Sequence, residues 1–160
     1  MSKSEVKVDK EGEWHKVSLG DLEAKVKVIE PKGIEMGHFF VLGSCAGEDI
    51  GQIVGTVRSG KRVTDFDTVH VKAERTEETR EDRRMAVSMM LYSAEAVFRG
   101  LGLKVLTMRT HPMMGRFLRD QLGWEGDLEG KNRTSTVDMT KDLEETELQL
   151  PEMLKKRKKQ

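Results

Sequence analysis

The sequence predicts one α/β (α+β) domain whose mixed sheet combines an antiparallel meander with a central parallel βαβ pair. Two observations carry this prediction. Three short apolar segments between His38 and Lys72 are separated by turn residues, as in strands joined by hairpins. From Val87 to Leu101 the apolar residues then recur every three or four positions, which is typical of a long amphipathic helix, and a further apolar strand begins at Val105.

The predicted elements follow one another along the chain. Residues 1–36 alternate charged and aliphatic positions between glycines and prolines, which predicts an extended arm or short strands with at most one short helical stretch, at 21–25. The run Phe39-Phe40-Val41-Leu42 is apolar on both faces and so marks a central strand. The first three core strands are predicted at 38–45, 52–57 and 66–72.

The second half of the chain completes the sheet. A strand at 105–109 follows the long helix, so it is expected to lie parallel to the strand at 66–72 through a right-handed crossover. Pro112 begins a helix at 113–122 that Gly123 ends, and a last strand is predicted at 134–140. We therefore expect an arm at 1–36, a core at 37–143 and a charged tail at 144–160.

The composition of the chain argues against several classes of function. The 28 Lys and Arg residues balance 28 Asp and Glu residues, so no global field draws the chain to nucleic acid or anionic lipid. The single cysteine, Cys45, cannot form an internal disulfide, and no Cys/His cluster has the spacing of a zinc site, so no metal is expected. Without a signal-like or membrane-spanning run, we expect a cytoplasmic protein, or a virion component if the coding genome is viral.

Four segments resemble a known family, the GNAT N-acetyltransferases. Gly51-Gln-Ile-Val-Gly-Thr-Val and Asp67-Thr-Val-His-Val resemble the third and fourth strands of that family. Ala94-Glu-Ala-Val-Phe-Arg-Gly-Leu-Gly-Leu-Lys-Val-Leu is similar to the passage from its long helix into the fifth strand. Arg116-Phe-Leu-Arg-Asp-Gln-Leu-Gly-Trp resembles its closing helix, which ends in Leu-Gly-Phe. The resemblance covers residues 38–143 and implies a divergent GNAT-like mixed sheet with abbreviated N-terminal helices.

The resemblance also implies where acetyl-CoA would bind. In the family, a glycine-rich loop before the long helix holds the CoA pyrophosphate on backbone N–H groups. Here residues 73–88 contain no glycine, and the nearest match is the segment 83–88, with two arginines and small residues. Acidic residues upstream oppose an anion, so a helix that begins near Thr76 is the alternative interpretation. The implied acetyl-CoA contacts are Val71, Ala73, Arg83, Arg84, Ala86 and Ser88.

The catalytic residues implied by the family are also altered. Many members place a tyrosine, which protonates the CoA thiolate, at the position that Arg119 occupies here. An arginine stays protonated, so it could stabilise a thiolate only by its charge. General-base candidates are His70, Glu74 and His111, because they lie near the ends of the two parallel strands; each is equally compatible with an ordinary solvated side chain. The only tyrosine, Tyr92, is expected to pack on the sheet.

Two functions therefore remain open from the sequence. The first is a divergent N-acetyltransferase that transfers an acyl group from acetyl-CoA to an amine. The second is a non-catalytic GNAT-fold assembly or interaction protein, because small phage-encoded GNAT-like proteins, some associated with virion assembly, share the degenerate active site. No membrane partner is expected. A basic run offers a contact to an acidic partner or nucleic acid, with a solvated tail as the alternative: Lys155, Lys156, Arg157, Lys158 and Lys159.

Overall fold

The computed structural model describes residues 7–32, 34–58, 63–71, 77–132 and 134–158, with the backbone alone at 7–11, 63, 67–71, 77–83 and 156–158. Its elements are, in chain order, β1 (Lys7–Glu11), β2 (Trp14–Leu19), β3 (Leu22–Ile29), β4 (Gly37–Cys45), β5 (Glu48–Val57), β6 (Val63–Val71), α1 (Glu77–Gly100), β7 (Val105–Thr110), α2 (Pro112–Leu122), β8 (Val137–Asp142) and α3 (Glu152–Lys158).

The eight strands form one sheet in the order of the chain. Every neighbouring pair is antiparallel except β6 and β7, which are parallel and are joined through α1. The predicted meander corresponds to β4, β5 and β6, and the predicted βαβ pair to β6, α1 and β7. The α/β (α+β) mixed sheet expected from the sequence is therefore confirmed.

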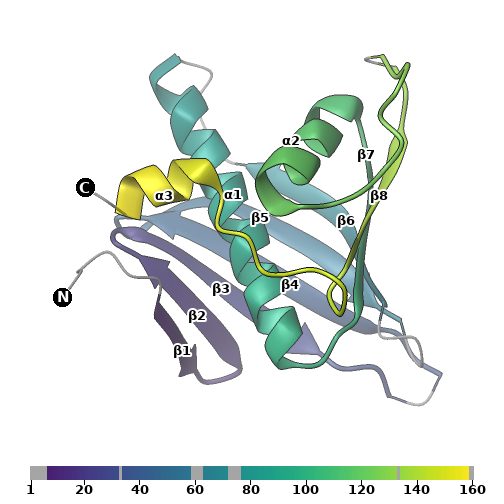
Figure 1. Cartoon of the computed structure of the whole chain (residues 1–160). Coiled ribbons are helices and arrows are strands. Elements are labelled where there is room, and N and C mark those ends of the chain that lie inside the picture. Colours follow the sequence, from purple (N-terminus) through teal and green to yellow (C-terminus); the bar gives the residue numbers. More distant parts are fainter. Residues whose placement is uncertain (1–6, 33, 59–62, 72–76, 133, 159–160) are drawn as a thin grey trace.

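The three helices lie on one side of the sheet (Figure 1). α1 packs on β3, β4, β5 and β6, α2 packs on β8, and α3 packs on α1. The core lies between α1 and the sheet, where the rings of Phe39, Phe66, Phe98 and Trp124 meet edge to face with centroids 5.0 to 6.0 Å apart. In the described chain, no helix is long and apolar enough to cross a membrane.

Short strands, one of the two forms predicted for residues 1–36, make up the described part before β4, and α3 forms within the charged tail. Residues 21–25 do not form a helical stretch but belong largely to β3, because Leu22, Ala24 and Val26 alternate with polar residues and point into the core. The described part before β4 therefore contains strands in place of abbreviated helices. In the tail, α3 is not simply solvated, because Leu154 is fully buried against the core.

Candidate functional site where the parallel strands part

The parallel pairing of β6 and β7 is short. It runs only from Val63 opposite Val105 to Phe66 opposite Met108. The register between β5 and β6 shifts at the same level, because Val54 pairs with Thr68 but Gly55 pairs with Phe66, which leaves Asp67 as an extra residue. Such a β-bulge bends and twists its strand. Beyond it, β6 continues beside β5 and β7 continues beside β8, so the two parallel strands lose their contact with each other.

The end of β7 leads directly into α2. His111 is exposed, takes an extended conformation at the N-cap of α2, and makes no side-chain hydrogen bond to the helix. Pro112 follows as the first helical residue, and the first turn carries no acidic side chain. The positive end of the helix dipole therefore lies at the level where β6 and β7 part. Met113 is 79% exposed beside it.

The predicted catalytic residues do not form one described cluster. His70 lies in β6 opposite Gln52, within the stretch that has left β7, and Glu74 lies outside the described residues. Arg119 lies in the last turn of α2, about 12 Å along the helix axis from His111. Its Nε donates to the Asp120 carboxylate at 2.9 Å, which raises the pKa of Arg119 and lowers that of Asp120.

The predicted phosphate contacts lie inside a helix. α1 begins at Glu77, in agreement with the alternative interpretation of the sequence, so the segment 83–88 runs from its second to its fourth turn. Ala86 and Ser88 are fully buried, and the Ser88 hydroxyl donates to the carbonyl oxygen of Arg84 at 2.8 Å. Because helical N–H groups already bond within the helix, these two residues are not available to a phosphate, and that expectation needs correction.

The remaining predicted cofactor contacts have different positions. The Arg84 side chain is exposed on α1, and Arg83 precedes it in the same helix. Val71 is the last residue of β6 and pairs with Gly51, whereas Ala73 lies outside the described residues. The exposed side chain of Arg84 on α1 is thus the predicted cofactor contact whose described position leaves it accessible to an anion.

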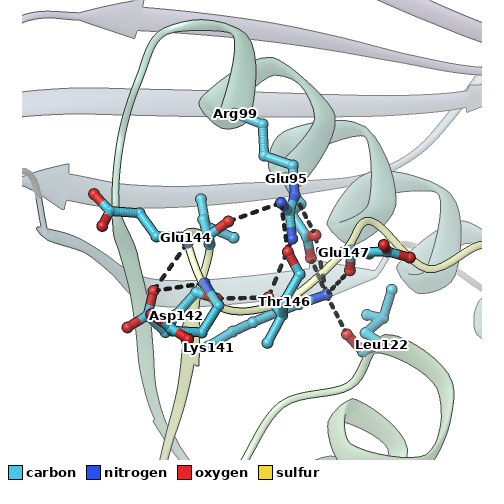
Figure 2. A network of polar contacts seen from close by, with 10 residues as sticks. Glu95, Arg99, Leu122, Lys141, Asp142, Glu144, Thr146 and Glu147 are labelled. Carbon is cyan, nitrogen blue, oxygen red and sulfur yellow. Dashed lines mark hydrogen bonds and ion pairs between the residues drawn. The ribbon is translucent and has the colours of Figure 1, made fainter.

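A buried ionic network lies on the helical side of the sheet, and sequence reasoning missed it (Figure 2). The Lys141 Nζ of β8 donates to both carboxylate oxygens of Glu95 at 3.0 Å, to the Leu122 carbonyl at 2.6 Å and to the Glu147 carbonyl at 3.1 Å. The Arg99 Nε binds the same carboxylate at 2.9 Å, and its other nitrogens reach Leu143 and Thr146.

This network is structural. It connects α1, the end of α2, β8 and the segment 143–147. Burial lowers the pKa of Lys141, an effect that the Glu95 carboxylate opposes. An open depression of about 570 Å³ lies beside Lys141, bounded mainly by residues 146–150 and Lys155. Because the lysine protons already face four protein acceptors, Lys141 offers no free donor to a ligand there.

The order of strands and helices from β4 to β8, with one parallel pair that parts at a bulge, defines a divergent GNAT fold. No family model and no curated protein sequence matches this chain. Among solved structures, PaiA N-acetyltransferase of Thermoplasma acidophilum, solved with coenzyme A, is similar at 14% identity and a TM-score of 0.44. The likeness covers 64% of this chain and 59% of that one.

Nourseothricin acetyltransferase is similar at 16% identity and a TM-score of 0.37, over 86% of this chain and 82% of the other. Both TM-scores are below 0.5, so neither likeness carries an argument about activity. The fold rests on the strand order and the parallel pair described above.

Proposed function

We propose that this protein binds acyl-CoA between β6 and β7 and transfers the acyl group to an amine. The observation that carries the proposal is the four-residue parallel pair, which ends at the bulge around Asp67. Beyond the point where β6 and β7 part, the backbone N–H and C=O groups on the facing edges of the two strands no longer pair with each other. The amide groups of a pantetheine arm can pair with such a strand as an added strand would, beside Val71 at the end of β6.

The CoA phosphates would meet cationic side chains in place of a glycine loop. Arg84 is exposed on α1, and Arg83 is its neighbour in the sequence. A guanidinium pairs with phosphate through two parallel hydrogen bonds, so it does not require a phosphate to approach the backbone. In this proposal, the arginines in the second and third turns of α1 bind the phosphates in place of Ala86 and Ser88, which are buried.

Acyl transfer would proceed by direct attack of the amine nitrogen on the thioester carbonyl. The new C–N bond forms, the C–S bond breaks, and the CoA sulfur leaves as a thiolate. His111 would take the amine proton as the base, because it is exposed beside the point where the strands part. His70 and Glu74 remain further candidates on β6 and after it. Arg119 would act on the thiolate only through its charge, which Asp120 partly offsets.

A second candidate function is a GNAT-fold interaction protein without turnover. The observation that favours it is the sheet face opposite the helices, where Phe40 and Leu42 on the central strand β4 remain exposed. The position of Arg119, where the family uses a tyrosine acid, is consistent with lost catalysis. Binding of acyl-CoA without transfer would favour this function.

Calorimetric titration with acetyl-CoA tests the binding step. We expect Arg84→Glu to weaken binding at least tenfold, because it places a carboxylate beside the phosphates. Lys32→Glu is the matched control, because it makes the same charge change in the exposed loop between β3 and β4, at the opposite end of β6 from Val71. No heat with millimolar acetyl-CoA, or equal loss in both variants, would contradict the proposal.

An activity assay on the same protein then distinguishes acetyl-CoA binding from acyl transfer. With an amine acceptor series, His111→Ala should lower turnover by about 10²- to 10⁴-fold, the usual contribution of a general base, while the affinity for acetyl-CoA is kept. Wild-type protein that binds acetyl-CoA but acylates none of the amines would support the interaction protein.

A further inference from the structure

A side-chain hydrogen bond joins β6 to β7 directly before the two strands part. Asp65 and Thr107 lie side by side in the parallel register, one residue before the last pair, Phe66 and Met108. Both lie on the open face of the sheet, which is the face opposite the helices, because the neighbouring Phe66 and Met108 are buried in the core. The Thr107 hydroxyl donates to the Asp65 carboxylate. We call this contact between Asp65 and Thr107 the β6–β7 clamp.

Arg58, the residue after β5, binds the same carboxylate. Its Nε donates to one oxygen of Asp65 at 2.8 Å, and its Nη2 donates to the other oxygen at 3.3 Å. A guanidinium that binds both oxygens fixes the orientation of the carboxylate. The Asp65 side chain is 20% exposed, so water has limited access to it. The β6–β7 clamp is therefore anchored to the end of β5 as well.

The next residue of β7 on the open face binds the other neighbouring strand. Arg109 donates from its Nε to Asp138 of β8 at 2.9 Å, whereas Thr107 donates to β6. In β6, the extra residue Asp67 follows two positions after Asp65. The side-chain partner of β7 thus changes from β6 to β8 at the level where the parallel backbone pairing ends.

We propose that the β6–β7 clamp fixes the level at which the strands part, and that Asp65 and Thr107 are positioning residues for acyl-CoA. The parallel ladder has only four residue pairs, and a ladder opens most readily from its end. A bond between the side chains of the third pair opposes that opening. The inference rests on the proposed function, in which the backbone groups beyond this level bind the pantetheine arm. The affinity for acyl-CoA should therefore fall with the fraction of molecules in which the ladder has opened.

Thr107→Val tests the clamp, because it removes the hydroxyl and keeps a β-branched side chain. We expect the dissociation constant of acetyl-CoA, measured by calorimetry, to rise about three- to tenfold, which corresponds to one hydrogen bond. Thr107→Ser keeps a hydroxyl and should bind within about twofold of the wild type. Thr140→Val is the matched control. It makes the same substitution on the same face of β8, directly opposite Thr107, and should leave the affinity unchanged.

A loss of stability alone is distinguished by thermal unfolding. The midpoint of Thr107→Val should fall by no more than about 4 °C, as expected for one hydrogen bond in a domain of this size. Calorimetry is carried out well below the midpoint of every variant. A fully folded variant that is only less stable then binds acetyl-CoA as the wild type does.

Amide hydrogen exchange of the ligand-free protein measures the opening of the ladder itself. In Thr107→Val, the amides that link β6 to β7 within 64–66 and 106–108 should exchange about threefold faster or more, and in Thr140→Val they should not. If Thr107→Val changes only one of the two quantities, or neither, the clamp does not position the strands, and the proposed function stands. Absence of acetyl-CoA binding by the wild type would instead contradict the proposed function and, with it, the role of the clamp.

Discussion

At the residue scale, the pair of Lys141 and Glu95 is the most enclosed ion pair in the described part of the chain, with both side chains 1% exposed. Removing Lys141 leaves the buried Glu95 carboxylate with one of its two cationic partners, because Arg99 still binds it at 2.9 Å. We therefore expect Lys141→Met to lower the free energy of unfolding by about 3 kcal/mol, the lower end of the range for a broken buried pair, as measured by urea denaturation. Glu95→Leu combined with Lys141→Met should be less destabilised than the sum of the single variants, because no charge of this pair then stays buried alone.

A surface pair provides the matched control. Lys104 and Glu144 are 3.3 Å apart with both side chains more than half exposed, so Lys104→Met should change stability by less than about 1 kcal/mol. Additive effects of Lys141→Met and Glu95→Leu would show that the two residues act separately. The sequence missed this pair for a local reason. The last strand was expected to end at Thr140, so Lys141 was not recognised as the next inward position after Val137 and Met139.

At the element scale, the bulge in β6 depends on a glycine in the neighbouring strand. A Cβ at Gly55 of β5 would overlap the carbonyl oxygen of Asp65 and the ring of Phe39. Neither can move easily, because one belongs to the backbone and the other to the core. Gly55→Ala should therefore lower the free energy of unfolding by about 3 kcal/mol, measured by urea denaturation.

Gly43 of β4 is the control for this substitution. A Cβ there would meet only the flexible side chain of Met90, at 2.9 and 3.0 Å, and Ile50 at 3.5 Å. Because Met90 can change rotamer, Gly43→Ala should alter stability by about 1 kcal/mol or less. If Gly55→Ala and Gly43→Ala changed the free energy of unfolding equally, the close approach of β5 and β6 would not depend on Gly55.

The sequence predicts those helices and strands whose pattern of apolar residues is visible within a short segment of the chain. The meander shows short apolar runs between turn residues, and α1 shows apolar residues every three or four positions, so the sequence predicts both. The sequence does not define the start of α1, because its first turns carry charged residues with no apolar stripe. For α3, seven residues are too few to show a period, and only the burial of Leu154 reveals that it packs. The site is predictable only as a region, since the parting of β6 and β7 depends on pairing between distant segments.

At the scale of the whole molecule, the N-terminal arm is part of the core. β2 pairs with β3 from His15 opposite Val26 to Leu19 opposite Leu22, so the strands within 7–29 share one sheet with the strands β4 to β8. Val17 and Leu19 are fully buried on the side of the helices. An arm attached loosely to an independent core would show neither feature.

Substitutions in β2 test this integration. Val17→Ala/Leu19→Ala should lower the free energy of unfolding by about 5 kcal/mol, because both side chains leave cavities in a packed core. That loss is comparable with the whole stability of a small domain, so the urea midpoint should fall steeply. Lys16→Arg/Ser18→Ala changes the two alternate positions of the same strand on the open face, keeps the charge and should move stability by about 0.5 kcal/mol or less. If both double variants unfolded at the wild-type midpoint, β2 would be an appendage, and the core would begin at a later strand.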